Sequence, residues 1–240
     1  MKRLGDPTGM KVRQRMLPWF AKEGRRFFWR NRELSPFHFL MLEVLLVRTR
    51  AQTVEGVADF LMQRCPDPQS LAAIRSSTLE SILEPLGLSR KRARALLALG
   101  ESLVACDGGR VPRRADKLLA LPYVGNYVCS AVRCFAFGAR VAVVDANVRR
   151  VVCRVVGRED WLSIGGPVPE EVYAIAQSWV PRRGPRRHAW ALIDLGATIC
   201  VSRPRCRDCP LQPVCAHARG EGARRLPVAR TGPCLPDAAP

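Results

Sequence analysis

The sequence predicts an all-α fold. Apolar residues recur at helical spacing in successive segments, no segment alternates like a half-buried strand, and glycine and proline separate the helical segments. The 240 residues contain no internal repeat, and 48% of them are hydrophobic, so the chain can bury the core of one large domain or two small ones.

The expected helices follow from their start and stop signals. Ser35 and Pro36 match an N-cap and a first helical position, and the helix that they start is expected to reach about Thr49. Gly87 ends a helix, and Ser89 is expected to cap the arginine-rich helix that follows, to about residue 105. The other helices are expected to start near residues 67 and 76 and to cover 115–120, 126–137, 146–156, 169–180 and 186–200.

The charge indicates a polyanionic partner. There are 39 Lys and Arg against 21 Asp and Glu, a net charge of +18, which suits nucleic acid or, as the alternative, an anionic membrane. The chain has neither an apolar run of about 18 residues nor a signal-peptide pattern. We expect a soluble cytoplasmic protein, associated with the nucleoid, and a monomer. Only five of the 39 basic residues are lysines, so few amines could form a Schiff base.

Four cysteines lie within sixteen positions, with five, two and five residues between them: Cys200, Cys206, Cys209 and Cys215. Four thiolates in one loop can hold either a 4Fe–4S cluster or a tetrahedral zinc ion. Zinc ribbons usually contain two close Cys-x-x-Cys pairs, whereas this loop contains one, which favours the iron–sulfur cluster. The other six cysteines are expected in the core or the tail rather than as ligands: Cys65, Cys106, Cys129, Cys134, Cys153 and Cys234.

Two further segments could carry chemistry. Residues 121–125, Leu-Pro-Tyr-Val-Gly, form a tight turn before a helix, so the backbone at Val124, Gly125 and Asn126 could bind a phosphate; an ordinary helix–helix turn is the alternative. Asp145 follows an apolar stretch at the start of another helix, where it could be a reactive carboxylate or only a helix cap. Neither segment alone decides the function.

Taken in order, the turn at 121–125, Val-Asp-Ala-Asn at 144–147, the segment 191–200 and the cysteine loop resemble endonuclease III and the mismatch DNA glycosylases related to it. The resemblance covers about residues 15–216. It implies two helical domains with a cleft for double-stranded DNA between them. The implied parts are a six-helix domain at 32–139, with a helix-hairpin-helix motif at about 115–138, a second domain at 8–31 and 140–216 that holds the 4Fe–4S cluster, and a flexible tail at 217–240.

Within this family, Asp145 matches the essential aspartate, and Tyr127 stands where bifunctional members have a lysine that forms a Schiff base. Because a phenol cannot form an imine with the sugar, the resemblance implies hydrolysis by water with little cleavage of the strand. Asp145 would then stabilise the oxocarbenium charge and orient or deprotonate the water. Tyr127 would shape the sugar pocket; a tyrosine that only packs on the core is the alternative.

Glu43 lies in a helix that is apolar on every side, where a carboxylate is costly unless it is used or paired, and desolvation should raise its pKa. By resemblance Glu43 reaches the extruded base, to which it could donate a proton or a hydrogen bond; a buried salt bridge with an arginine is the alternative. Val47 and Arg48 match the loop that wedges into the duplex, with Val47 filling the vacated stack and Arg48 facing the partner base.

The thymine mismatch glycosylases resemble the chain most, through Tyr127, Gly87–Ser89 and Glu43–Leu46. The predicted substrate is therefore DNA with thymine or uracil opposite guanine. Adenine mismatch glycosylases are the main competing group, but they usually have serine in place of Tyr127 and a C-terminal recognition domain, whereas about 25 residues follow the cysteine loop here. The chain could also be a non-catalytic iron–sulfur DNA-binding protein or a bifunctional lyase.

Two features depart from the family pattern. Tyr123 replaces the first glycine of the turn, although a positive φ is unfavourable for tyrosine. The first cysteine interval, between Cys200 and Cys206, is also one residue shorter than is usual in the family.

Overall fold

The fold comes from a computed structural model that describes residues 7–162 and 167–220, and within these ranges all regular structure is helical. This confirms the predicted all-α class. Of the helices described, none is both long and apolar enough to span a membrane. The described residues form two compact units: the central unit, Arg26–Phe137, and the terminal unit, which joins the residues up to Arg25 to those from Gly138 onward.

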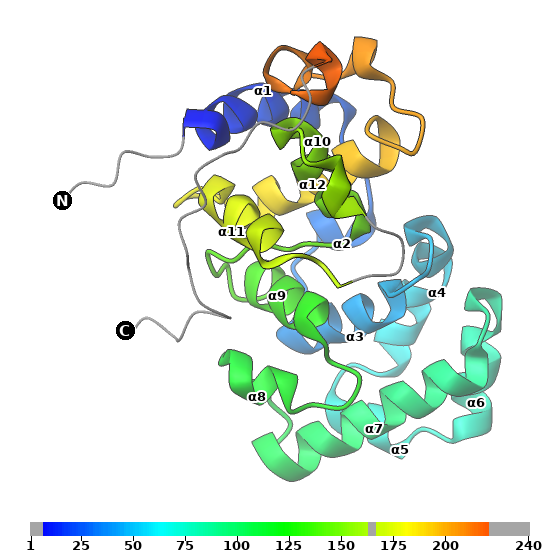
Figure 1. Cartoon of the computed structure of the whole chain (residues 1–240). Helices are drawn as coiled ribbons and strands as arrows, with labels where there is room; N and C mark the ends of the chain where they lie inside the picture. The colour runs from blue at the N-terminus through cyan, green and yellow to red at the C-terminus, as the bar shows by residue number, and fades with distance from the viewer. Residues whose placement is uncertain (1–6, 163–166, 221–240) are drawn as a thin grey trace. The chain divides into compact units, whose positions relative to one another are not determined.

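The central unit is built around α3. Eight of the eleven residues of this helix are buried, and it packs against α4 and α9, while α7 packs against α5 and α6 (Figure 1). The helices of the unit are α2 (Phe28–Asn31), α3 (Pro36–Leu46), α4 (Ala51–Arg64), α5 (Pro68–Ala73), α6 (Ser76–Leu83), the 3₁₀ helix η1 (Glu84–Leu86), α7 (Ser89–Asp107), α8 (Ala115–Leu119) and α9 (Asn126–Phe135).

Two of the sequence signals act as predicted at the helix starts. Ser35 is the N-cap of α3, where its hydroxyl accepts from the backbone of His38 at 3.2 Å, and Pro36 opens the helix. The prediction for Ser89 was wrong, because this serine is the first residue of α7 and the cap position belongs to Leu88, at φ 52° and without a side-chain cap. The helix of Pro36 also ends at Leu46 rather than near Thr49, because the backbone leaves the helical region at Val47, with ψ 116°, and then reaches φ 56° at Arg48.

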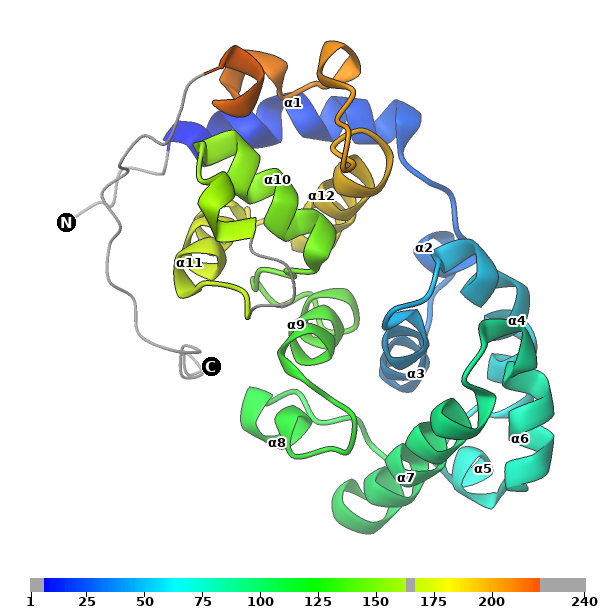
Figure 2. The ribbon, with the colours of Figure 1, turned by 45° about the vertical axis from the view of Figure 1, so that its right-hand side comes forward.

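The terminal unit brings the two ends of the described chain together. In it α1 packs against α11 and α12, and α10 packs against α12 (Figure 2). Gly196 allows the close approach of α12 to α10, since a Cβ at this position would lie 2.6 Å from the Cβ of Asn147. The helices are α1 (Pro7–Glu23), α10 (Ala146–Val156), α11 (Glu170–Trp179), α12 (Pro185–Thr198) and the 3₁₀ helices η2 (Glu159–Leu162), η3 (Cys206–Asp208), η4 (Gln212–Val214) and η5 (His217–Arg219).

Three bounds differ from the expected ones, the first being the end of the central unit, which lies at Phe137 rather than at residue 139. The central unit begins at Arg26 rather than at residue 32, because Phe27 and Trp29 stack at 4.6 Å and belong to its core. The tail was expected from residue 217, but His217 lies in η5, and its Nδ1 is 2.7 Å from Oε1 of Glu159. Residues 221–240, including Cys234, lie outside the described part of the chain.

Candidate active site and cysteine loop

Asp145 is both a helix cap and an oriented carboxylate. It precedes α10, where its Oδ1 accepts from the backbone of Val148 at 2.7 Å and its Oδ2 accepts from Nδ2 of Asn147 at 2.8 Å. Asp145 as a whole is half-buried. Its dense surroundings raise the pKa of Asp145 through desolvation, while these hydrogen bonds and the charge of Arg150 oppose the rise. The capping role expected as the alternative is therefore observed, and the same two hydrogen bonds fix the direction of the carboxylate.

The orientation of Asn147 is itself fixed by Arg150. Nη2 of Arg150 donates to Oδ1 of Asn147 at 2.9 Å and to the carbonyl of Gly196 at 2.7 Å, and Nε donates to the carbonyl of Cys200 at 2.6 Å. These bonds attach the start of α10 to the end of α12. The amide of Asn147 consequently has one orientation in which both of its ends are satisfied, and in that orientation its NH₂ group faces Asp145.

In the central unit, Glu43 and Tyr127 form a hydrogen-bonded pair. Glu43 lies on α3 with 3% of its surface exposed, and the half-buried phenol of Tyr127, on α9, donates to its Oε2 at 3.0 Å. The two residues are 84 positions apart in the sequence, and the packing of α3 on α9 brings them together. The phenol partly compensates the cost of burying the carboxyl group.

The turn before α9 contains a left-handed tyrosine and leads into an uncapped helix N-terminus. Tyr123 adopts φ 62°, so the tyrosine that replaces glycine does occupy the left-handed region, and its side chain is exposed. Val124 is buried, and its N–H closes the turn on the carbonyl of Leu121 at 3.3 Å, so Val124 anchors the turn. Gly125 and Asn126 are exposed, and no side chain caps the N-terminus of α9.

The residues expected to wedge into DNA lie on an exposed turn. Val47 follows the last residue of α3 and has 42% of its surface exposed, and Arg48 beside it is exposed in a left-handed conformation. An exposed aliphatic side chain next to a cation at the end of a buried helix is compatible with insertion between bases.

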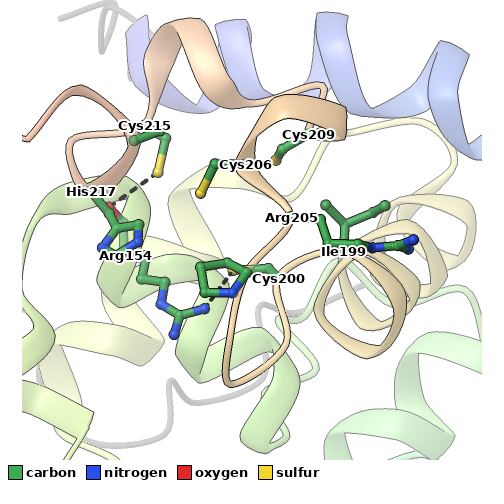
Figure 3. Close-up of a pocket in the computed structure, with 10 residues that line it drawn as sticks. Arg154, Ile199, Cys200, Arg205, Cys206, Cys209, Cys215 and His217 are labelled. Atoms are coloured by element: carbon green, nitrogen blue, oxygen red, sulfur yellow. Dashed lines mark hydrogen bonds between the residues drawn. The ribbon is translucent and has the colours of Figure 1, made fainter.

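The four cysteines of the loop line one small cavity, together with Arg154 (Figure 3). Arg154 is buried, and its Nη1 donates to Sγ of Cys200 at 3.4 Å and to the carbonyl of Val201 at 2.6 Å. Sγ of Cys215 donates to the carbonyl of Arg154 at 3.4 Å. Burial raises the pKa of Cys209 to about 11, so this thiol keeps its proton at neutral pH unless a metal displaces it.

The spacing of these thiols bears on which metal they suit. In the described ranges, no three cysteine, histidine or carboxylate side chains are grouped closely enough to hold one metal ion. A tetrahedral zinc site would draw all four sulfurs to about 2.3 Å from one centre. Both a zinc ion and an iron–sulfur cluster accept four thiolates, so the donor chemistry of this loop fits either group.

The sequence did not predict the residues that hold Asp145 and the start of the cysteine loop in place. Asn147, Arg150 and Arg154 lie at helical spacing along one side of α10, and each of them donates toward Asp145 or toward residues 196–202. The available signal was this i, i+3, i+7 spacing of polar residues directly after Asp145. Arg92, which contacts the turn at Val47, gave no comparable signal.

Known proteins are similar to this chain over residues of both the central and the terminal unit. A family model described as "HhH-GPD superfamily base excision DNA repair protein" matches residues 41–182. The thymine-DNA glycosylase of Aeropyrum pernix is 31% identical over 210 residues, which cover 86% of this chain and 93% of that protein. The adenine DNA glycosylase of Mycobacterium tuberculosis is 36% identical over 199 residues, which cover 82% of this chain and 64% of that protein. A solved structure of a thermostable thymine-DNA glycosylase matches with a TM-score of 0.81 at 30% identity and covers 90% of this chain and 100% of that chain.

Proposed function

This chain belongs to the HhH-GPD superfamily of base excision DNA repair proteins, and from that membership we propose that it is a monofunctional DNA glycosylase that removes thymine or uracil opposite guanine. The observation that carries the proposal is the combination of an oriented carboxylate, Asp145, with a tyrosine rather than a lysine at position 127. The first supplies charge stabilisation to a sugar cation, and the second leaves water as the nucleophile.

In the proposed reaction Asp145 acts at the sugar. The N-glycosidic bond breaks with its electron pair going to the base, and the ionised carboxylate stabilises the positive charge that develops at C1′. The oxygen of a water molecule then bonds to C1′, and its proton passes to Asp145. The hydrogen bonds from Val148 and Asn147 serve this role because they hold the carboxylate in place and oppose the rise of its pKa.

Glu43 and Tyr127 act on the base side of the same nucleotide. The departing base needs a proton or a hydrogen bond to carry its extra electron pair, and Glu43 is the buried acid available to the central unit for this. Tyr127 holds the carboxyl group of Glu43 in one position. Asp145 belongs to the terminal unit and Glu43 to the central unit, and we propose that both act on the same extruded nucleotide of the bound DNA.

The remaining exposed elements bind the duplex. Gly125 and Asn126 offer backbone N–H groups to a phosphate at the uncapped start of α9, without regard to base sequence. Val47 enters the space left by the extruded base, and Arg48 contacts the guanine left behind.

We also propose that the cysteine loop holds a 4Fe–4S cluster. Cys200, Cys206, Cys209 and Cys215 would be its ligands, since all four line one cavity, and the single Cys-x-x-Cys pair of the loop favours the cluster over zinc. When bound, the cluster would cross-link the loop through its bonds to the four thiolates, and the regular structure of this loop consists only of short 3₁₀ helices. Brown colour and about four irons per chain in protein purified without oxygen are the expected result; one zinc and no iron would contradict it.

The test of the function is a base-release panel. Duplexes with T:G, U:G, A:G and A opposite oxidised guanine are incubated with the wild type and with Asp145→Asn, and both released base and binding are measured. We expect release from T:G and U:G by the wild type alone, and binding by both proteins. Release from the adenine substrates only would favour the adenine glycosylase, for which the relative at 36% identity is the supporting observation. Binding without release from any duplex would favour a non-catalytic protein.

Strand cleavage is measured in the same reactions. A product that is nicked without alkali, and that borohydride traps on the protein, would contradict the monofunctional mechanism and support a lyase.

A further inference from the structure

One guanidinium connects the exposed turn at Val47 to a different helix. Arg92 lies in the first turns of α7, and its Nη1 donates to the carbonyl of Leu45 at 3.1 Å. Its Nη2 donates to the hydroxyl of Thr49, and its Nε donates to the carbonyl of Gly87 at 3.0 Å. Arg92 therefore spans the turn that carries Val47, from the end of α3 to Thr49, and connects it to Gly87, two residues before the start of α7.

The turn has few other hydrogen bonds to hold it. Within the segment, the backbone of Thr49 donates to the carbonyl of Leu46 at 3.2 Å, and its hydroxyl donates to the carbonyl of Val47 at 3.3 Å. Across the described part of the chain, the bonds from Arg92 are those that tie residues 45–49 to another element. Arg48 adopts a positive φ, which is unfavourable for a residue other than glycine and persists only where its surroundings hold it.

The position of Arg92 suits this task chemically. The last carbonyl groups of a helix have no partner within the helix and carry the negative end of its dipole, so a cation at Leu45 is favourable there. A planar guanidinium can also bond three acceptors in fixed directions at once, which a lysine ammonium on a flexible stem does less well.

We propose that Arg92 is a positioning residue for base extrusion: it holds the turn of Val47 and Arg48 in the conformation that enters the duplex. The inference rests on the proposed function, in which these two side chains fill the gap and face the partner base. Arg92 does not contact the nucleotide; it acts through the turn. Its loss should therefore slow the extrusion of the base, while the groups at Asp145 and Glu43 stay unchanged.

Extrusion can be measured apart from chemistry. A T:G duplex carries 2-aminopurine next to the mismatched thymine, so that its fluorescence rises when the thymine leaves the stack. The fluorescence is recorded on binding by Asp145→Asn protein, alone and combined with Arg92→Ala, Arg92→Lys or Thr49→Val. Arg94→Ala is the matched control, because it removes the same charge from an exposed position on the same helix.

We expect Arg92→Ala to bind the duplex with a Kd close to that of its parent and to give a much smaller rise in fluorescence. In the background that retains Asp145, its single-turnover excision rate should fall by about 10- to 100-fold. Arg92→Lys and Thr49→Val should be intermediate, and Arg94→Ala should match the wild type. Thr49→Val removes one acceptor and no charge, so it tests the same bond if Arg92→Ala does not fold.

Three outcomes would overturn the inference. One is a full rise in fluorescence and a full excision rate with Arg92→Ala. Another is an equal loss for Arg92→Ala and Arg94→Ala, which would indicate a general effect of charge on DNA binding. The third is a loss that follows the melting temperature alone across all four variants. Failure of the proposed function looks different, because the wild type would then release no base from any duplex of the panel.

Discussion

Removal of the Asn147 amide should shift the pH dependence of base excision. This amide donates to Oδ2 of Asp145 at 2.8 Å, and burial already raises the pKa of that carboxyl group. The proposed reaction needs the ionised form of Asp145, so activity is lost as the pH falls through this raised pKa. Because the amide stabilises the ionised form, Asn147→Ala raises the pKa further and moves the loss of activity to higher pH.

The size of the shift follows from one hydrogen bond. A hydrogen bond to a charged group is worth about 1.5 kcal/mol or more. One pKa unit corresponds to about 1.36 kcal/mol. Asn147→Ala should thus displace the acid limb upward by about one pH unit, while the rate on the plateau at higher pH falls less.

The assay is single-turnover excision from a T:G duplex at a series of pH values, with the enzyme in excess. Gln63→Ala serves as the control, because Gln63 donates a comparable amide hydrogen bond to Asp59 at 3.2 Å on the exposed side of α4. A rate that falls equally at every pH, with the acid limb in place, would refute the electrostatic part of the reasoning and leave Asn147 a purely steric role. A limb that moves equally in Gln63→Ala would refute the assignment to Asp145.

Three other perturbations follow from the same structure. Tyr127→Phe removes the phenol bonded to Glu43 at 3.0 Å, so the unfolding temperature should fall by about 2–4 °C and the excision rate with it; an unchanged rate would mean that the phenol is only a packing group. Gly196→Ala places a Cβ against α10 and should cost about 1–3 kcal/mol of stability by thermal unfolding, whereas Gly56→Ala, with nothing within 4 Å, should not destabilise; a neutral Gly196→Ala would show that the two helices can separate freely. Cys206→Ser should abolish iron binding and lower the unfolding temperature, and a variant that retained four irons would exclude this thiol as a ligand.

Local signals in the sequence predicted most of the helices and the cap of α3. Ser35 with Pro36 marks a helix start whose partners lie within three residues, so no tertiary information is needed. Periodicity also placed α10 at Ala146–Val156, as the structure has it. The end of α3 could not be predicted, because the turn after Leu46 depends on Arg92, which is 43 to 47 positions further along the chain.

In the candidate site, too, features set by neighbouring residues could be predicted, whereas contacts between residues distant in the sequence could not. Asp145 could be singled out because its position before a helix is visible locally. The hydrogen bond between Glu43 and Tyr127 could not be derived, because it requires the packing of two helices whose contacting residues are 84 positions apart. Arg150 was missed for a related reason. Two of its acceptors are the backbone carbonyl groups of Gly196 and Cys200, and because every residue has such a group, the residue types do not reveal the hydrogen bonds.

The way the two units divide the chain has a consequence for synthesis. Of the helices in the described residues, α1 is made before the others, whereas its partners α11 and α12 are made much later; Arg13, for example, donates to the carbonyl of Trp179, 166 positions further along the chain. The central unit, by contrast, is continuous in the chain and has all of its core residues once Phe137 has emerged. During translation the central unit should therefore be able to fold before α11 and α12 have been made. Until then α1 cannot pack against these two partners.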